Sequence, residues 1–215
     1  MEIEWKTDDK EVSFEESIKF MEKRNREVIN KNSPNLVWLT SHPSLYSAGI
    51  SAKDSDLLEP KIPVFKTNRG GKYTYHGPGI RIIYVMFDLK ELFMPNRPDI
   101  SKFINLLENW IINSLSKVGI KGEIRKDRVG IWVKTNNSEE KIAAIGIKLK
   151  KWVTYHGIAV NINPNLQYFN DIIPCGIKEF GVTSLEKLGI TTTQEEFDKI
   201  LQEEFTKIFE EFTKK

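Results

Sequence analysis

The sequence predicts an α+β fold in which helices flank one β-sheet. Three long segments carry apolar residues at helical spacing, near the start, in the middle and at the C-terminal end of the chain. Between them lie short runs rich in β-branched and aromatic residues, which are typical of strands. These segments do not follow the strict strand–helix alternation of a doubly wound fold, so the pattern favours α+β.

Capping residues indicate where the three helices begin. Ser13 with Glu16, and Thr193 with Glu196, have the spacing of a capping box, in which each residue satisfies a free amide of the first turn. Pro98 and Asp99 come at the beginning of the middle segment, where both residue types favour a helix start. The helices are therefore predicted over residues 13–31, from about 98 to 119, and from 193 towards the C-terminus.

The predicted strands are short runs separated by turn residues. They cover residues 36–39, 64–67, 80–87, 130–133, 142–147 and 154–162, whereas residues 54–63 are expected to form a loop. Run 80–87 is the densest in β-branched and aromatic residues, so it is expected at the centre of the sheet. The last three runs follow one another closely, which predicts a hairpin or meander.

Composition restricts the class of protein. A chain of 215 residues with 40% apolar residues can bury a full core, and residues 1–215 are expected to form a single domain. No apolar run approaches the roughly 20 residues of a membrane helix, and the N-terminus is charged, so we expect a cytoplasmic protein. The net charge of +2 gives no strong attraction to nucleic acid. One cysteine excludes an internal disulfide, and three histidines offer no metal-ligand spacing.

The segment 69–79 is unusually rich in special residues. Four glycines, a proline, an arginine and a histidine occur within its eleven positions. Glycines let a backbone approach a ligand closely, and a histidine offers hydrogen bonds near neutral pH. A P-loop would need glycine at Lys66 and Ser or Thr at Tyr73, and a dinucleotide fingerprint would need glycine at Ile82, so both nucleotide motifs fail. Taken alone, the segment is better explained as a tight loop whose glycines only serve turns of the sheet.

Two further residues are candidates for chemistry. Cys175 lies between Pro174 and Gly176, which suits a thiol held at a defined turn, although a lone cysteine is usually a small buried apolar residue. Lys141 opens a strand whose alanines and Gly146 leave room beside the backbone for a ligand. A lysine near a thiol can lower the pKa of that thiol or carry its proton. From spacing alone, an ordinary solvated lysine is favoured for Lys141.

Histidines outside segment 69–79 are weaker candidates. His156 stands in a Thr-Tyr-His-Gly string that repeats residues 74–77, and it could either line a pocket or make a structural hydrogen bond. His42, followed by Pro43, could contribute to the wall of a binding pocket or simply close a loop.

Taken together, these motifs resemble the lipoyl(octanoyl) transferase family. The resemblance runs from about residue 42 to 185 and rests on residues 69–79, 129–133, 141–146, 156–157 and 174–176. Lys141 and Cys175 also stand at the separation that the family shows. Ile80 departs from the pattern, because the family usually has glutamine there. The resemblance implies a mixed β-sheet with flanking helices, similar to the catalytic domains of biotin and lipoate protein ligases.

The resemblance also implies an activity and roles for these residues. The family transfers an octanoyl group from octanoyl acyl carrier protein to a lysine of lipoyl domains, those of 2-oxoacid dehydrogenase complexes and the glycine cleavage protein, without metal or cofactor. Cys175 would be the nucleophile that forms an acyl thioester, and Lys141 would carry its proton. The implied substrate-binding residues are Arg69, Gly70, Gly71, Lys72, Tyr73, Thr74, Tyr75, His76, Ala144, Ile145, Gly146, Gly157, Ile158 and Ala159.

Two other functions stay open at this point. An ATP-dependent lipoate or biotin protein ligase would activate a free acid and would not need Cys175 as nucleophile. A module that only docks lipoyl domains or carrier protein would have Cys175 merely buried. Dependence on ATP separates the first alternative from acyl transfer, and the reactivity of the Cys175 thiol separates the second.

Overall fold

A computed structural model describes residues 1–126, 128–135, 138–173 and 180–213. The helices are α1 (Phe14–Ile29), α2 (Leu89–Leu92), α3 (Ile100–Lys117) and α4 (Gln194–Thr213). The strands are β1 (Ile3–Thr7), β2 (Asn35–Thr40), β3 (Leu45–Ala48), β4 (Val64–Lys66), β5 (Tyr73–His76), β6 (Ile80–Met86), β7 (Glu123–Arg125), β8 (Arg128–Lys134), β9 (Glu139–Lys150), β10 (Val153–Asn161) and β11 (Gly181–Val182). Short 3₁₀ helices cover Asp54–Asp56 and Leu166–Asp171.

One large mixed sheet organises the molecule. Its strand order is β1-β2-β6-β10-β9-β8-β7, and β11 pairs with β9 beyond the end of β10. β1 runs parallel to β2 and β11 runs parallel to β9, whereas the other pairs are antiparallel. β8, β9 and β10 follow one another as neighbours, which confirms the predicted meander. A smaller sheet of order β4-β3-β5 lies apart from it.

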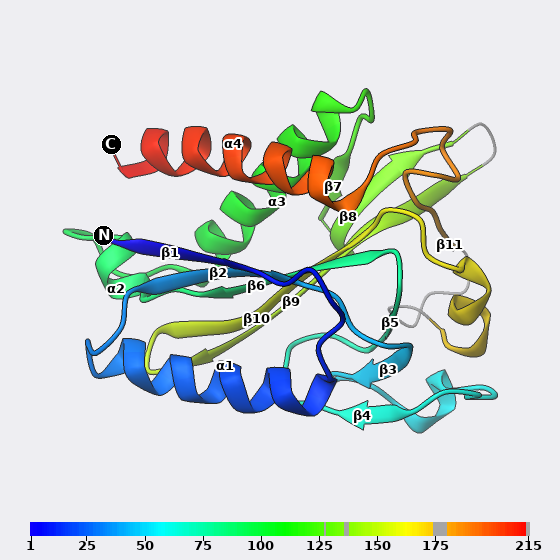
Figure 1. Cartoon of the computed structure of the whole chain (residues 1–215), viewed down its shortest axis with the longest axis horizontal. Helices are drawn as coiled ribbons and strands as arrows, with labels where there is room; N and C mark the ends of the chain where they lie inside the picture. The colour runs from blue at the N-terminus through cyan, green and yellow to red at the C-terminus, as the bar shows by residue number, and fades with distance from the viewer. Residues whose placement is uncertain (127, 136–137, 174–179, 214–215) are drawn as a thin grey trace.

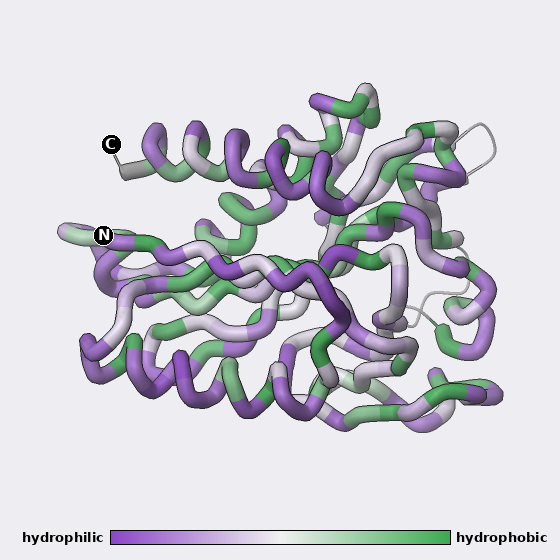
Figure 2. The backbone as a smooth tube through the Cα atoms, viewed as in Figure 1, coloured by the Kyte–Doolittle hydropathy of each residue, from purple (hydrophilic) through white to green (hydrophobic). Residues whose placement is uncertain are grey.

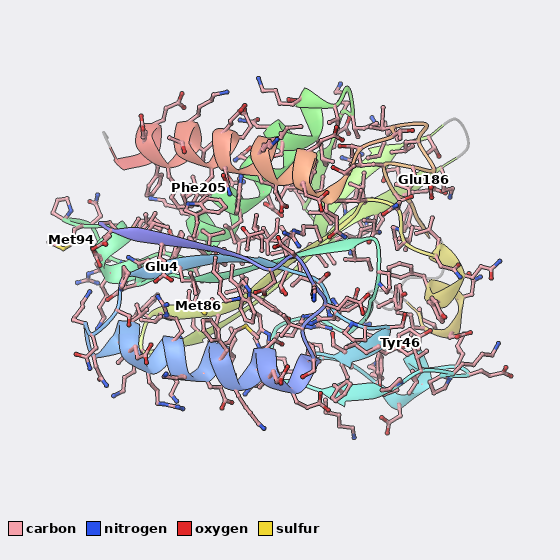
Figure 3. All side chains as sticks on the ribbon, viewed as in Figure 1. Glu4, Tyr46, Met86, Met94, Glu186 and Phe205 are labelled. Carbon is pink, nitrogen blue, oxygen red and sulfur yellow. The ribbon has the colours of Figure 1, made fainter. Side chains whose placement is uncertain are left out.

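Helices cover both faces of the large sheet (Figure 1). α3 and α4 lie on one face, where Phe205 of α4 points towards the sheet (Figure 3). α1 and the small sheet lie on the other face, where Met86 and Tyr46 belong to a second apolar core. Hydrophilic and hydrophobic residues alternate along α1 and α4, as expected of helices with one buried face (Figure 2).

The predicted caps explain where two of the helices begin. The Ser13 hydroxyl accepts a hydrogen bond from the Glu16 amide, which fixes the start of α1. Asp99 does the same for α3, because its carboxylate accepts from the amides of Ser101 and Lys102. No helix in the described part of the chain is long and apolar enough to cross a bilayer.

The structure differs from the sequence prediction in the glycine-rich segment. Residues 73–76 form strand β5, which pairs with β3, so only the flanking glycines are turn residues. β1 and β3 were also not expected. β3 is short, and the helical or strand periodicity of so few residues is too weak to detect.

Two central strands approach each other closely at Gly157. A Cβ at this position would lie 1.8 Å from the carbonyl oxygen of Ile83 on β6. The preceding residue, His156, has a φ of 63° in the left-handed region, which is uncommon outside glycine. Glycine at 157 therefore lets β10 pack against β6. The neighbouring His156 lines a cavity beside β10.

Candidate functional site

A cavity of about 270 Å³ lies where β5 and its preceding loop face β9 and β10. Its walls are mostly apolar, and this size is near the lower end of the roughly 300–1,000 Å³ of small-molecule sites. Predicted site residues that line it are Arg69, Gly71, Lys72, Tyr73, Thr74, His76, Lys141, Ala144, Ile145, Gly146, Gly157, Ile158 and Ala159. The fold thus brings three separate segments of the sequence to one cavity.

Two predicted residues lie outside the cavity lining. Tyr75 points into the second apolar core, where its ring stacks on Tyr168 at 4.8 Å and its hydroxyl lies 3.0 Å from the Ser44 hydroxyl. The Gly70 amide donates a 3.2 Å hydrogen bond to the Ile147 carbonyl of β9. This hydrogen bond joins the loop to the sheet.

Other lining residues were not selected from the sequence. They are Phe14, Ser51, Ile82, Tyr84, Arg128, Val129, Asn161, Phe169 and Val182, together with His156, which was only a secondary candidate. Tyr84 and Ile82 belong to β6, where alternation places successive side chains on opposite faces of the sheet. Whether Ile82 and Tyr84 line the cavity depends on which face of the large sheet the small sheet covers. The sequence pattern does not contain that information.

Lys141 is buried at the cavity wall rather than solvated at a turn. Only 5% of its surface is exposed. Its Nζ donates a 2.9 Å hydrogen bond to the Val129 carbonyl and lies 4.7 Å from the centre of the Trp132 ring. Val182 of β11 pairs with Lys141 in the sheet. The lysine is therefore held between three neighbouring strands.

Gly130 opens the space that the Lys141 side chain occupies. It has a φ of 117°, and a Cβ here would lie 2.6 Å from the Ala143 carbonyl oxygen and 3.4 Å from the Lys141 ammonium. The pairing of β8 with β9 shifts register between Ile131 and Trp132, next to this glycine. An irregular strand with glycine at the bend is a common way to re-aim a side chain near a site.

Arg69 holds the glycine-rich loop in place. Its guanidinium donates to the carbonyls of Ser47, Gly70 and Lys72 at 2.7, 2.9 and 2.8 Å, and it is 9% exposed. A planar group with five donors suits several carbonyls at once. Arg69 therefore lines the cavity chiefly as the residue that shapes its loop.

All three histidines are buried around the cavity as neutral rings. Burial, together with the nearby Arg69 guanidinium, lowers the pKa of His156 to about 3. Burial also holds the pKa of His76 well below its usual range and lowers that of His42. The Tyr84 hydroxyl lies 2.7 Å from Nε2 of His42. None of these rings carries charge at neutral pH, so they act as hydrogen-bonding groups.

Cys175 lies outside the described residues, but its sequence neighbours border Lys141. The Phe180 ring packs against the Trp132 ring, with their centroids 5.6 Å apart. The same Trp132 ring also contacts Nζ of Lys141. The Thr183 amide donates to the Lys141 carbonyl at 2.9 Å. Phe180 and Thr183, which come after Cys175 in the sequence, therefore lie close to Trp132 and Lys141.

The geometry joins one buried amine to an apolar cavity with small side chains on its walls. Such a site can bind an alkyl chain and transfer a proton at one end of it. A family model described as the lipoyl protein ligase A/B catalytic domain matches residues 13–206. The chain belongs to this family.

Within the lipoyl protein ligase A/B family, similar proteins are named as octanoyltransferases. One from Wolbachia pipientis subsp. Culex pipiens (strain wPip) is 54% identical over 185 residues, covering 86% of this chain and 89% of that protein. Another, from Parvibaculum lavamentivorans, is 50% identical over 190 residues, covering 86% and 83%. The resemblance drawn from the motifs is confirmed, and the protein is an enzyme of the acyltransferase class.

Solved structures confirm the fold. A bipartite lipoate protein ligase from Thermoplasma acidophilum has a TM-score of 0.71 at 13% identity, covering 99% of this chain and 91% of that one. A lipoate-protein ligase A bound with ATP has a TM-score of 0.70 at 14% identity, covering 98% and 93%. The biotin protein ligase from Aquifex aeolicus in complex with biotin and ATP has a TM-score of 0.59. The expected mixed sheet with flanking helices is that of these ligases.

Proposed function

We propose that the protein transfers an octanoyl group from octanoyl acyl carrier protein to a lysine of lipoyl domains through an acyl thioester on Cys175. The observation that carries this proposal is the burial of Lys141 at the wall of an apolar cavity, where its Nζ is held by the Val129 carbonyl and the Trp132 ring. The choice of octanoyl as the acyl group comes from the names of the similar proteins, which are octanoyltransferases.

The cavity wall suits a straight alkyl chain. Ala144, Gly146, Gly157 and Ala159 leave only small side chains or none on the two strands that line it. Burying each methylene of a fatty acyl chain stabilises the complex by about 0.8 kcal/mol. Small residues beside Ile158 therefore provide room and apolar surface together.

The first half of the reaction is a transfer between two sulfur atoms. The amine of Lys141 takes the proton of the Cys175 thiol and becomes an ammonium, and the thiolate so formed attacks the carbonyl carbon of the donor thioester. A carbon–sulfur bond to Cys175 forms, and the carbon–sulfur bond to the carrier breaks. The carrier leaves as a thiol, protonated by Lys141.

The second half moves the acyl group from sulfur to nitrogen. The amine of the lipoyl-domain lysine attacks the Cys175 thioester, a carbon–nitrogen bond forms, and the bond to Cys175 breaks. Lys141 carries the proton from the attacking amine to the leaving thiolate, which restores the starting enzyme. The reaction needs neither ATP nor a metal.

The carrier protein, the lipoyl-domain acceptors of the 2-oxoacid dehydrogenase and glycine cleavage systems, and the cytoplasmic location are predictions from the resemblance. In this reaction, the carrier protein and the lipoyl domain must each bring a flexible arm to the same cavity. Ping-pong chemistry meets this requirement, since the two proteins can bind in turn.

A transfer assay tests the proposal directly. The protein is incubated with octanoyl acyl carrier protein and an apo lipoyl domain without ATP, and the mass of the lipoyl domain is measured. Octanoylation without ATP is the expected result. Octanoylation only from free octanoate with ATP would instead indicate a ligase, and no octanoylation under either condition would leave a docking module.

A further inference from the structure

A buried chain of three polar side chains runs beside the cavity, from Arg69 through Ser47 to His76. Nη2 and Nε of Arg69 donate to the Ser47 hydroxyl oxygen at 2.9 and 3.3 Å. The same hydroxyl oxygen lies 2.8 Å from Nε2 of His76. Ser47 is fully buried in β3, and His76 is 7% exposed at the end of β5. The functional role of Ser47 is not explained by the mechanism above.

Counting hydrogen-bond donors fixes where the protons lie among Arg69, Ser47 and His76. A guanidinium only donates hydrogen bonds, so the Ser47 oxygen accepts from Arg69 with both of its lone pairs. The single hydroxyl hydrogen is then left for His76, and Nε2 must accept it. Because a neutral imidazole carries one proton, that proton lies on Nδ1. Ser47 therefore selects the Nδ1–H tautomer of His76.

This tautomer gives His76 a donor for which the described part of the chain has no acceptor. Nδ1 of His76 is buried and has no hydrogen-bond partner among the described residues. Buried donors are almost always satisfied by protein, water or ligand. Since His76 lines the cavity, a molecule bound there is a natural partner for Nδ1–H.

His42 shows what a satisfied ring looks like in the same cluster. Its Nδ1 donates to the Val12 carbonyl at 2.7 Å, so its Nε2 accepts from the Tyr84 hydroxyl at the same distance. Both rings have the same tautomer, but of the two only the His42 ring has a partner for its proton among the residues that the structure describes. The unsatisfied donor is therefore particular to His76.

We propose that Ser47 is a positioning residue that holds His76 as the Nδ1–H tautomer, and that this N–H donates to the carbonyl oxygen of the acyl group in the cavity. The inference rests on the proposed function, because an octanoyl group has one hydrogen-bond acceptor, its carbonyl oxygen. A fixed donor favours the substrate bound with that oxygen next to His76, and it needs no rearrangement when charge develops there.

Nitrogen NMR of the histidine rings tests the tautomer without reference to activity. The chain has only three histidines, so single variants assign each ring in a long-range proton–nitrogen spectrum. In the free protein, Nδ1 of His76 is expected to show the shift of a protonated nitrogen and Nε2 that of an acceptor. Protonation of Nε2 instead would overturn the proposal, whether or not the protein transfers octanoyl groups.

Serine variants test the positioning role. Ser47→Ala removes the hydroxyl hydrogen, so His76 is expected to shift towards the Nε2–H form or a mixture, with kcat/KM lowered about tenfold, as for one lost hydrogen bond. Ser47→Thr keeps the hydroxyl and should restore both properties. Ser114→Ala is the matched control, because Ser114 is equally buried but bonds to Trp110 within α3. Unchanged His76 shifts in Ser47→Ala would contradict the role of Ser47.

A non-reactive donor tests the ligand contact. An octanoyl amide analogue of the carrier thioester keeps the carbonyl oxygen but does not acylate the enzyme. Its binding is expected to move the Nδ1–H resonance of His76 and to leave that of His42 in place. His76→Asn, which keeps a polar group near the position of Nδ1, should retain more activity than His76→Gln. A saturating analogue without effect on the Nδ1–H resonance would overturn the contact, although transfer activity itself could persist.

Discussion

The ammonium of Lys141 donates a 2.9 Å hydrogen bond to the main-chain carbonyl of Val129. This contact joins β9 to β8 at the edge of the cavity, and it fixes the amine within a few ångströms of one point. A lysine held in this way differs from a surface lysine, whose long side chain samples many conformations.

Replacing Lys141 should abolish proton transfer while the fold is retained. Lys141→Met keeps the length and volume of the side chain but removes the amine, so octanoyl transfer is expected to fall at least about 100-fold. Initial rates of lipoyl-domain octanoylation measure this effect, and thermal unfolding reports on the fold. Lys150→Met, at an exposed position of the same strand, is the control and should retain normal activity. Comparable rates for both variants would contradict the role of Lys141.

Gly157→Ala should destabilise the protein through a backbone clash. The added methyl group would lie 1.8 Å from the Ile83 carbonyl oxygen in the middle of the large sheet, where neither strand can move freely. We expect a loss of about 3 kcal/mol or more in the free energy of unfolding, measured with urea. Gly181→Ala is the control, because its new methyl group would meet only the flexible Glu140 side chain. A loss below about 1 kcal/mol at position 157 would show that β6 and β10 can separate there.

Stability should fall as the pH drops below about 6.5, the pKa of an unfolded histidine. His156 has a folded pKa of about 3, so between these values the unfolded state binds more protons than the folded state. Each such histidine removes up to about 1.4 kcal/mol per pH unit of acidification. Urea midpoints between pH 7 and pH 5 measure the slope. His156→Asn, which tolerates a positive φ, should show a shallower slope, and an identical slope would contradict the neutral buried ring.

Filling the cavity wall should shorten the preferred acyl chain. Ala159 lines the cavity from β10 and is 7% exposed, so Ala159→Leu is expected to occupy part of the space for the acyl tail. Octanoyl transfer should lose about fourfold in kcat/KM for each methylene that no longer fits, relative to a hexanoyl or butanoyl donor. Competition between octanoyl and hexanoyl carrier protein measures the ratio. An unchanged preference would place the tail elsewhere.

The sequence predicts the sheet and the helices where periodicity and caps are strong. Ser13 and Asp99 mark the observed starts of α1 and α3, and the run from 130 to 162 forms the predicted meander. Short elements such as β3 could not be predicted, since their pairing partners are distant in sequence. Secondary structure therefore follows mostly from local signals here, and tertiary pairing supplies the rest.

The candidate site was predictable only in part. Segment 69–76, Lys141 and the small residues of β9 and β10 could be selected from motifs, and most of them line the cavity. Burial of Lys141 could not, because it depends on the turn at Gly130 and on the ring of Trp132. The part that Ser47 plays was likewise hidden, since only its contacts with Arg69 and His76 distinguish it from other serines.

Intact mass measurement after incubation with octanoyl acyl carrier protein, without ATP or acceptor, tests the central claim most directly. The account predicts a gain of one octanoyl group that hydroxylamine removes, and no such gain in Cys175→Ser. A folded protein that gains no octanoyl group from a competent donor, or that gains it equally in Cys175→Ser, would contradict the thioester on Cys175.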